Sequence, residues 1–406
     1  MKRKAGKLSV LIVTGLALYV TNVFSIPAIE MDYICPIGKE KFKSIDYSPQ
    51  CPTNKFVMFK KEFTKEELKK YEKIINSKEY KAIPKTLPKE YYLAKFYEMA
   101  GGFFDKEIGE TYYKAYTAQI NWNSENTDVL KESLTKGIDY LEKSLSSGKK
   151  DDFPSSLAYL YISNGEYDKA NALIEKQNKD IHLEKISNFY YNISGMQMPE
   201  DDYYHYNRYK YYNESGVDEK AKKIFREKAL SYLQAVIRKN NGQYSQLELF
   251  RQADLYSSFG NKKAVDELFS KTPSKYWEPI VSYYLDEPEG TISEVYNKNN
   301  LVTEADLKKA LSYADKLEKM TFKSFKDNTD VEMKYLKRND YLKSAILKAE
   351  TERRLGKFEE ASKTLSKINI ADIKDTVFNR DFEKLKELIG KRDGSVSQYT
   401  PLPIRY

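Results

Sequence analysis

The chain has 406 residues, of which 41% are hydrophobic and 32% are charged, so its composition is that of a folded protein and excludes long disordered stretches. Its net charge is +8, and four of the positive charges belong to Lys2, Arg3, Lys4 and Lys7 at the very start. Beyond them both signs are interleaved, which excludes the one-sided basic stripe of a nucleic-acid-binding protein.

Residues 1–25 have the layout of a secretory signal peptide. A positive segment, Met1–Lys7, is followed by the apolar stretch Leu8–Val20 and by spacing that suits cleavage after Ser25 or after Ala28. An uncleaved membrane anchor is the alternative, because the 17-residue stretch Leu8–Phe24 is at the short limit of a spanning helix. Both readings predict an exported protein of the periplasm or cell envelope of a bacterium, which contacts the membrane only through an uncleaved N-terminal segment.

Two cysteines, Cys35 and Cys51, are the only ones in the chain. In an oxidising compartment such a pair is expected to form a disulfide, and closing a loop of this size contributes about 3 kcal/mol. A zinc site is the alternative, but zinc prefers four Cys or His ligands and the only histidines, His182 and His205, are far away in the sequence. We therefore expect a disulfide and neither a metal nor another cofactor.

Each cysteine begins a similar turn. Cys35-Pro36-Ile37-Gly38 is expected to lead into a strand at residue 42, and Cys51-Pro52-Thr53-Asn54 into a strand at 56–59. These strands would pair, so residues 30–62 predict a small disulfide-linked β-ribbon, called the knob below. A helix is expected to follow directly, with Thr64 as its N-cap, Glu67 completing a capping box, and its end near Asn76.

Residues 33 to about 75 resemble the bacterial domain-of-unknown-function family numbered 2225, whose members carry paired Cys-Pro-x-Cys knuckles before a Phe-rich strand and TPR-like helices. In this chain the second cysteine of each knuckle is replaced, by Gly38 and Asn54, so half of the zinc ligands are absent. The resemblance implies a degenerate knuckle in which a disulfide stands where cytosolic relatives hold zinc. It implies no known activity.

Residues 63–389 predict a mainly α fold, a TPR-like α-solenoid of irregular helix pairs. In the best copy of the TPR pattern, Ala158 and Ala170 let two helices approach, and Gly165 permits the turn between them. Further copies, in order of decreasing match, comprise Ala349, Glu352, Gly356, Phe358, Ala361 and Leu365; then Ala253, Tyr256, Gly260, Val265 and Phe269; then Ala94, Tyr97, Gly101 and Phe103.

Three further helices are expected over Glu132–Ser147, Glu219–Asn240 and Thr303–Phe325, the last capped by Thr303 and Asp306. The stretches 147–152 and 196–202 are expected to be loops. Residues 390–406, with Pro401 and Pro403, are expected to form an extended flexible tail.

The expected function is a non-catalytic scaffold that binds a protein or peptide partner in a groove of the array. The groove candidates are Tyr91, Ser155, Tyr159, Ile162 and Ile346. A second candidate surface is an aromatic cluster of Tyr203, Tyr204, Tyr206, Tyr209, Tyr211 and Tyr212, whose alternative role is packing.

No catalytic residues are assigned, because phosphate loops, zinc-protease motifs and nucleophile elbows are all missing from the sequence. An envelope enzyme that acts on glycans through paired carboxylates is the alternative, and the 60 acidic residues do not single out a pair for it.

Overall fold

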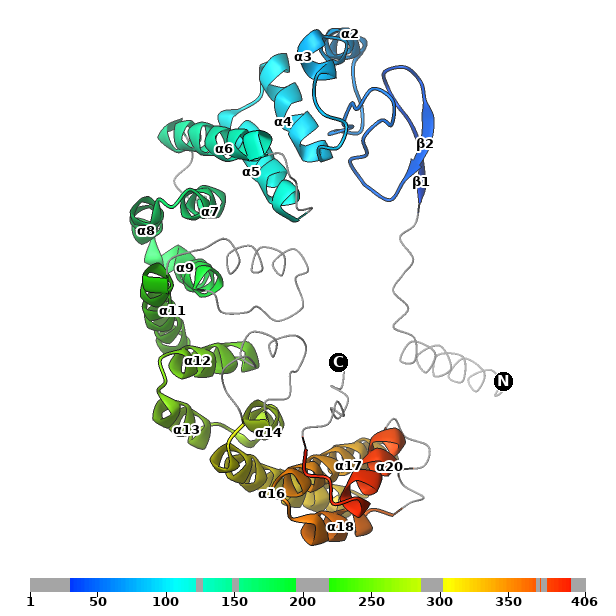
Figure 1. The fold of residues 1–406 in the computed structure, drawn as a ribbon, viewed down its shortest axis with the longest axis vertical. Helices are drawn as coiled ribbons and strands as arrows, with labels where there is room; N and C mark the ends of the chain where they lie inside the picture. Colours follow the sequence, from blue (N-terminus) through cyan, green and yellow to red (C-terminus); the bar gives the residue numbers. More distant parts are fainter. Residues whose placement is uncertain are drawn as a thin grey trace, which may run out of the picture. The chain divides into compact units, whose positions relative to one another are not determined.

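The computed structural model describes residues 30–121, 127–147, 153–194, 219–285, 302–369, 373 and 378–395. These residues form two compact units, one within Met1–Asn171 and one within Ala172–Tyr406. Figure 1 shows helices throughout both units and a single small sheet near the start of the chain. The predicted mainly α fold with an N-terminal β-ribbon is confirmed.

The ribbon consists of two antiparallel strands, β1 (Met31–Ile34) and β2 (Lys41–Ser44), with Tyr33 paired to Phe42. The prediction of one strand after each cysteine turn was half wrong. Residue 42 lies in a strand, but its partner precedes the first turn, and segment 56–59 makes only an isolated bridge between Val57 and Gln50. Each turn therefore closes its own short antiparallel pairing, because a tight turn joins most easily the two segments that flank it.

The helices of the first unit are α2 (Lys65–Ile75), α3 (Lys78–Lys81), α4 (Lys89–Ala100), α5 (Asp105–Asn121), α6 (Thr127–Ser147) and α7 (Ser155–Ser163). The start of α2 is as predicted: the Thr64 hydroxyl accepts from the backbone of Glu67, whose carboxylate accepts from the backbone of Thr64. Helix α6 begins one turn before the predicted Glu132. Helices α5 and α6 approach closely at Gly109, where an added Cβ would lie 2.7 Å from Leu141 Cγ.

The knob is not a separate domain. Phe56 is fully buried, and its ring lies 5.5 Å from that of Phe96 on α4 and 6.2 Å from that of Tyr71 on α2. The two cysteines belong to the same hydrophobic cluster as these rings. The predicted boundary at residue 62 therefore runs through a shared core, and the division into compact units falls after Asn171 instead.

Helix α8 (Tyr167–Glu175) crosses the division between the units. The second unit then contains α9 (Lys179–Ile193), α11 (Glu219–Lys239), α12 (Gln246–Ser258), α13 (Lys262–Ser270), the short 3-10 turn η1 (Ser274–Tyr276), α14 (Trp277–Leu285), α16 (Glu304–Asp327), α17 (Val331–Arg354), α18 (Phe358–Ser366) and α20 (Asn379–Gly390). The predicted helices at 219–240 and 303–325 correspond to α11 and α16. Thr303 and Asp306 form the predicted capping box of α16.

Three glycines make the same turn between consecutive helices. Gly165, Gly260 and Gly356 have φ of 76°, 71° and 72°, a conformation that side chains disfavour. In each turn the glycine N–H donates to the carbonyl three residues earlier, at 2.8 to 3.0 Å, and the next N–H donates to the carbonyl five residues before it, at 2.8 to 3.0 Å. This is the Schellman pattern, in which the end of one helix is sealed before the next begins.

The residues around these glycines also repeat. The helix after each turn, α8, α13 or α18, has nine residues. The positions that the TPR pattern assigns to packing are buried in every copy: Ala158, Ala253 and Ala349 before the turn, and Ala170, Val265 and Ala361 after it. The three strongest predicted copies are thus confirmed.

The fourth predicted copy, at Gly101, differs. Gly101 has φ of 61°, but its N–H donates to the carbonyl of Tyr97, four residues back, and the helix that follows has 17 residues instead of nine.

Among the helices that the structure describes, none combines the length and the hydrophobicity that a bilayer crossing requires.

Candidate functional site

The two cysteine turns have the same backbone geometry. The N–H of Cys35 donates to the carbonyl of Glu40, and the N–H of Cys51 to the carbonyl of Phe56, both at 2.8 Å. The fifth residue of each turn, Lys39 or Lys55, has φ near +60°. The duplicated Cys-Pro-x-x pattern is therefore a duplication in space and not only in sequence.

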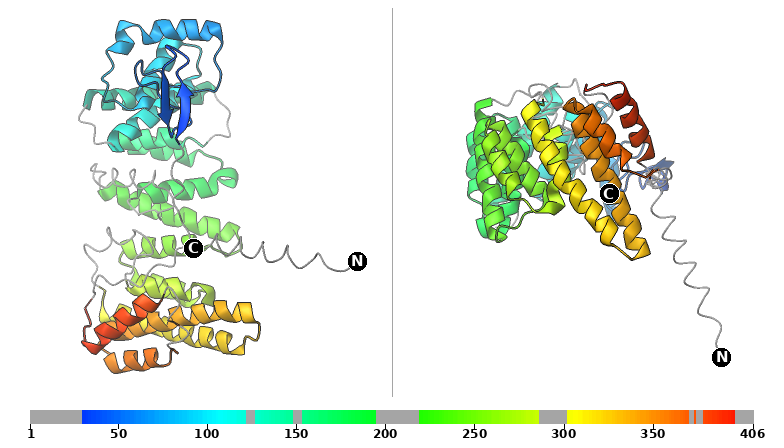
Figure 2. Two further views of the ribbon diagram at one scale, coloured as in Figure 1. Left: turned by 90° about the vertical axis from the view of Figure 1, so that its right-hand side faces the viewer. Right: turned by 90° about the horizontal axis from the view of Figure 1, so that it is seen from below.

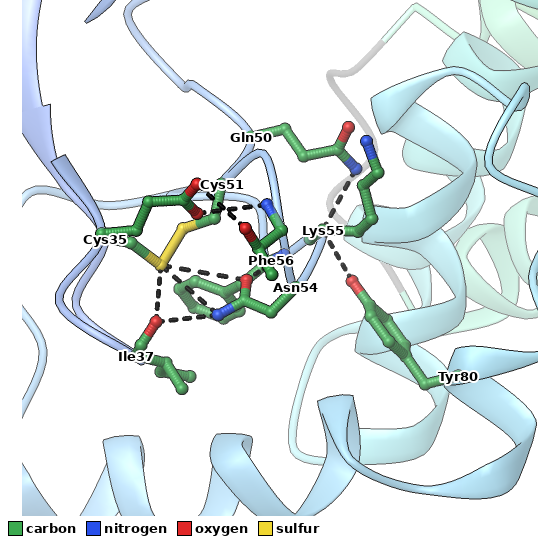
Figure 3. Close-up of a disulfide and its surroundings, with 10 residues drawn as sticks. Cys35, Ile37, Gln50, Cys51, Asn54, Lys55, Phe56 and Tyr80 are labelled. Atoms are coloured by element: carbon green, nitrogen blue, oxygen red, sulfur yellow. Dashed lines mark hydrogen bonds between the residues drawn. A yellow bond between two sulfur atoms is a disulfide. The ribbon is translucent and has the colours of Figure 1, made fainter. Parts of the chain in front are cut away.

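Three links join the two turns (Figure 3). A disulfide connects Cys35 and Cys51, whose Cα atoms are 5.7 Å apart. The Asn54 side-chain amide donates to the carbonyl of Ile37 at 2.8 Å, and its nitrogen lies 3.6 Å from Cys35 Sγ. The Glu40 carboxylate accepts from the backbone and hydroxyl of Thr53, at 3.1 and 2.9 Å.

The disulfide is a buried structural crosslink. Both cysteines have no solvent exposure, and the turns rest on the ring of Phe56 and on Tyr80 of α3, whose hydroxyl donates to the carbonyl of Lys55 at 2.9 Å. Gly38 and Asn54 contribute no metal ligand of the Cys or His type. Within the described part of the chain, no group of three Cys, His, Asp or Glu side chains is placed to hold a metal ion.

The predicted groove residues lie elsewhere than expected. Tyr91, Tyr159, Ile162 and Ile346 are between 2% and 5% exposed, so their side chains pack between helices and do not face a ligand. Only Ser155, at the start of α7, is half-buried. The spacing identified helix-packing positions correctly, but it could not tell which side of each helix faces solvent. The tyrosine cluster from Tyr203 to Tyr212 lies outside the described residues.

A second repeated feature joins the helices in threes. In each instance a carboxylate from one helix, a tyrosine from the next, and a lysine and a tyrosine four residues apart on a third helix come together. We call this set a lysine–tyrosine quartet. The three quartets are Glu98, Tyr112, Lys136 and Tyr140; Glu175, Tyr190, Lys228 and Tyr232; and Asp266, Tyr284, Lys309 and Tyr313.

The contacts in the quartets correspond. The lysine Nζ lies 2.7 Å from Glu98, 2.6 Å from Glu175 and 2.8 Å from Asp266 in the three cases. The same nitrogen lies 5.4 to 5.5 Å from the ring centroid of the quartet's first tyrosine, a cation–π distance. The two tyrosine rings of each quartet stack, with centroids 6.2, 5.6 and 6.2 Å apart.

The tyrosine hydroxyls complete the arrangement. Tyr112 and Tyr140 donate to the two different oxygens of Glu98, at 2.5 and 3.1 Å, and Tyr190 and Tyr232 donate to the two oxygens of Glu175, at 3.3 and 2.6 Å. In the third quartet Tyr284 donates to Asp266 at 2.6 Å. Each glutamate thus accepts from three donors on two other helices.

The donors decide the ionisation of these glutamates. Burial alone would raise the pKa of Glu98, but hydrogen bonds from Lys136 and Tyr112 outweigh it and hold the pKa below its ordinary value. The same balance, with Lys228 and Tyr232 as donors, lowers the pKa of Glu175. Burial and the neighbouring carboxylates raise the pKa values of Tyr112, Tyr190 and Tyr284. At neutral pH Glu98 and Glu175 are therefore charged, and Tyr112, Tyr190 and Tyr284 are protonated.

The lysine of each quartet is partly exposed to solvent. The lysine side chains are 31%, 30% and 33% exposed, whereas Tyr112 and Tyr190 are fully buried. The buried tyrosine fixes the geometry, and the lysine presents part of its surface to solvent. Each quartet hence holds three helices together and places one partly exposed lysine beside a tyrosine ring.

The quartets were not predicted from the sequence, although the sequence contains a signal for them. Residues 228–232 and 309–313 are the identical pentapeptide Lys-Ala-Leu-Ser-Tyr, and residues 136–140 are Lys-Gly-Ile-Asp-Tyr. The shared Lys–small–aliphatic–x–Tyr pattern places lysine and tyrosine on one helix face, with the small residue buried against the neighbouring helix.

Comparisons of the chain with protein-family models, with curated proteins and with solved structures found no match.

Proposed function

We propose that the chain is an exported, non-catalytic scaffold whose TPR-like helices hold a protein or peptide partner. The observation that carries the proposal is the threefold recurrence of the Gly165, Gly260 and Gly356 turns, each with the same hydrogen bonds and a nine-residue second helix. Repeated helix pairs of this kind form extended surfaces that serve recognition in solenoid proteins.

The export part of the proposal rests on the N-terminal signal-like segment and on the disulfide. Disulfides persist in oxidising compartments and are rare in the cytosol. The resemblance to the 2225 family is consistent with the same reading, since the two cysteine turns match each other in backbone geometry while the second cysteine of each knuckle is replaced. We propose a degenerate knuckle that exchanged its metal for a covalent bond.

The non-catalytic part of the proposal rests on the state of the accessible carboxylates. A general acid needs a raised pKa, but Glu98 and Glu175 have lowered pKa values and are saturated by donors. Burial does raise the pKa values of Asp254, to about 7, and of Glu352, but both side chains are buried. These features support a scaffold over the alternative of a glycan-cleaving enzyme.

Peptide selection on the immobilised whole chain, followed by fluorescence anisotropy with the selected peptide, tests the proposal. We expect saturable binding, and we expect Lys136→Gln and Lys228→Gln to weaken it at least threefold while far-UV circular dichroism stays unchanged. Lys223→Gln, at an exposed position on the same helix as Lys228, is the matched control. Failure to select any saturable peptide, or release of reducing ends from envelope glycans, would contradict the proposal.

A further inference from the structure

The hairpin formed by α16 and α17 is longer than the repeat requires. Helices α12 and α17 both end at an equivalent glycine turn, after Ser258 and Arg354, but α12 has 13 residues and α17 has 24. The additional turns lie at the N-terminus of α17 and are matched by the C-terminal turns of the 24-residue α16. Figure 2 shows these two helices as the long yellow and orange pair.

Residues 319–340 make up this part of the hairpin, which we call the hairpin tip. It carries six of the exposed large hydrophobic side chains of the described chain: Met320, Phe322, Val331, Met333, Tyr335 and Leu336. Val331 is 84% exposed, and Tyr335 and Leu336 are each 54% exposed. Such a concentration of apolar side chains is unusual on a solvent-facing surface and indicates an interaction site.

The charges on the hairpin tip are mixed with these apolar side chains. The six basic residues are Lys319, Lys323, Lys326, Lys334, Lys337 and Arg338, and the four acidic residues are Asp327, Asp330, Glu332 and Asp340. Asp330 is occupied as the N-cap of α17, where its carboxylate accepts from the backbone of Met333 at 2.8 Å. Asp340 is paired with Lys337 at 3.2 Å.

Three lysines of the hairpin tip form no salt bridge to any described residue. In the described part of the chain Lys323, Lys326 and Lys334 have no carboxylate within ion-pair distance. Lys326 lies instead over the ring of Phe322, at 5.5 Å. Arg338 likewise lies 4.7 Å from the centroid of Tyr335. Cations beside exposed aromatic and aliphatic side chains are typical of helices that lie at the surface of an anionic bilayer.

We propose that the hairpin tip docks onto an anionic lipid surface, with Val331, Met333, Tyr335 and Leu336 entering the interface and Lys323, Lys326 and Lys334 facing the headgroups. A bilayer fits the tip because it accepts apolar side chains around the full circumference of a helix end, whereas a protein groove would leave some of them exposed. The inference is independent of the proposed peptide-binding function, since it uses none of the quartet residues.

An environment-sensitive fluorophore reports this contact locally in the whole chain. The native cysteines are joined and buried, so Leu336→Cys provides a single reactive thiol for a nitrobenzoxadiazole label. Ile181→Cys, at an exposed position of α9, provides the matched control. With vesicles of phosphatidylglycerol and phosphatidylcholine we expect a blue shift and an intensity gain of at least twofold at position 336 and no change at position 181. Pure phosphatidylcholine vesicles should give less than half of the gain.

Two variants separate the causes. Lys323→Glu with Lys326→Glu should abolish the preference for anionic vesicles, and Val331→Asp should abolish the signal in all vesicles. An unchanged spectrum at position 336, or equal changes at 336 and 181, would overturn the proposal. A response to polyglutamate instead of vesicles, or one that grows with protein concentration in the absence of lipid, would assign the tip to an acidic protein partner or to self-association and would likewise overturn it.

Discussion

Lys228 and Lys309 begin two identical pentapeptides, and each reaches a carboxylate on the nine-residue helix that follows a glycine turn. The two lysines lie on different helices, α11 and α16, yet their carboxylate partners, their cation–π rings and their stacked tyrosines correspond. A similar lysine, Lys136, occupies the same place in the first unit. The body of the chain therefore repeats at the level of three packed helices as well as at the level of the helix pair.

The quartets should stabilise the units through their hydroxyl groups. Tyr232→Phe removes the 2.6 Å hydrogen bond to Glu175 but keeps the stacked ring, so we expect the free energy of unfolding to fall by about 1 kcal/mol. Chemical denaturation followed by circular dichroism measures the change. Tyr313→Phe is the matched control, because no hydrogen bond from Tyr313 to Asp266 is formed, and an equal loss in both variants would refute this role of the hydroxyl.

A fully buried ion pair fixes the end of α17. Arg353 donates to both oxygens of Glu350, at 2.7 Å each, and also to the carbonyl oxygens of Asp393 and Ser395 beyond α20. Glu350→Gln would leave the guanidinium buried without a countercharge, so we expect a loss of about 3 to 5 kcal/mol. The midpoint of urea unfolding measures it.

Glu387→Gln is the control for that substitution. Glu387 is exposed and pairs with Lys391 at 2.6 Å and with Lys384 at 3.0 Å. An exposed pair contributes little because solvent screens it, so we expect almost no shift of the midpoint. Similar midpoints for the two variants would show that the pair between Glu350 and Arg353 does not hold the second unit together.

Removing the disulfide should weaken the first unit selectively. Cys35→Ala with Cys51→Ala opens a loop of 16 residues, which costs about 3 kcal/mol. Trp277 lies in the second unit, so its fluorescence in a Trp122→Phe background reports that unit, while far-UV circular dichroism reports both units. We expect the circular dichroism to show a transition shifted to lower denaturant while the Trp277 midpoint stays unchanged. Two reactive thiols in the native, unreduced protein would contradict the premise.

Asp254 should make stability depend on pH. Burial raises its pKa from the ordinary value of 3.8 to about 7, although Tyr191 and Arg251 oppose the shift. The folded state then binds a proton more tightly than the unfolded chain does, so this contribution to stability is lost as pH rises from about 4 to about 7. Asp254→Asn should remove that slope and should be more stable, relative to the parent, at pH 8 than at pH 5.

Thermal unfolding at several pH values tests the role of Asp254. The exposed Asp327, replaced by Asn, serves as the control and should leave the slope unchanged. If Asp254→Asn keeps the parent's slope between pH 4 and pH 7, another group is responsible for it.

Local features of the fold were predictable because their causes are local. The capping boxes at Thr64 and Thr303, and the turns at Gly165, Gly260 and Gly356, depend on residues a few positions apart. Glu352 stands where the best copy has Tyr161, four residues before the glycine, and the turn still forms because its backbone hydrogen bonds do not involve the side chain.

The candidate site was less predictable because its parts come from separate helices. Each quartet draws its carboxylate, tyrosine and lysine from three helices, and no spacing within one helix reveals that they meet. The exposure of Tyr91 or Tyr159 likewise depends on which neighbour covers it, and so these residues were assigned to a groove although they are buried. The strand pairing was half wrong because it is decided by the segments that flank each turn.

The place of the disulfide in the chain has a consequence for biogenesis. Both cysteines lie among the first 51 residues, and the contacts between their turns use only residues 35–56. If the chain is exported from its N-terminus, as we propose, this ring closes while most of the helices have yet to cross the membrane. The disulfide-linked turns would then be complete before α2 and α4 fold, so Tyr71 and Phe96 would pack onto a preformed surface. This surface covers the apolar face that the first repeat of a solenoid would otherwise expose.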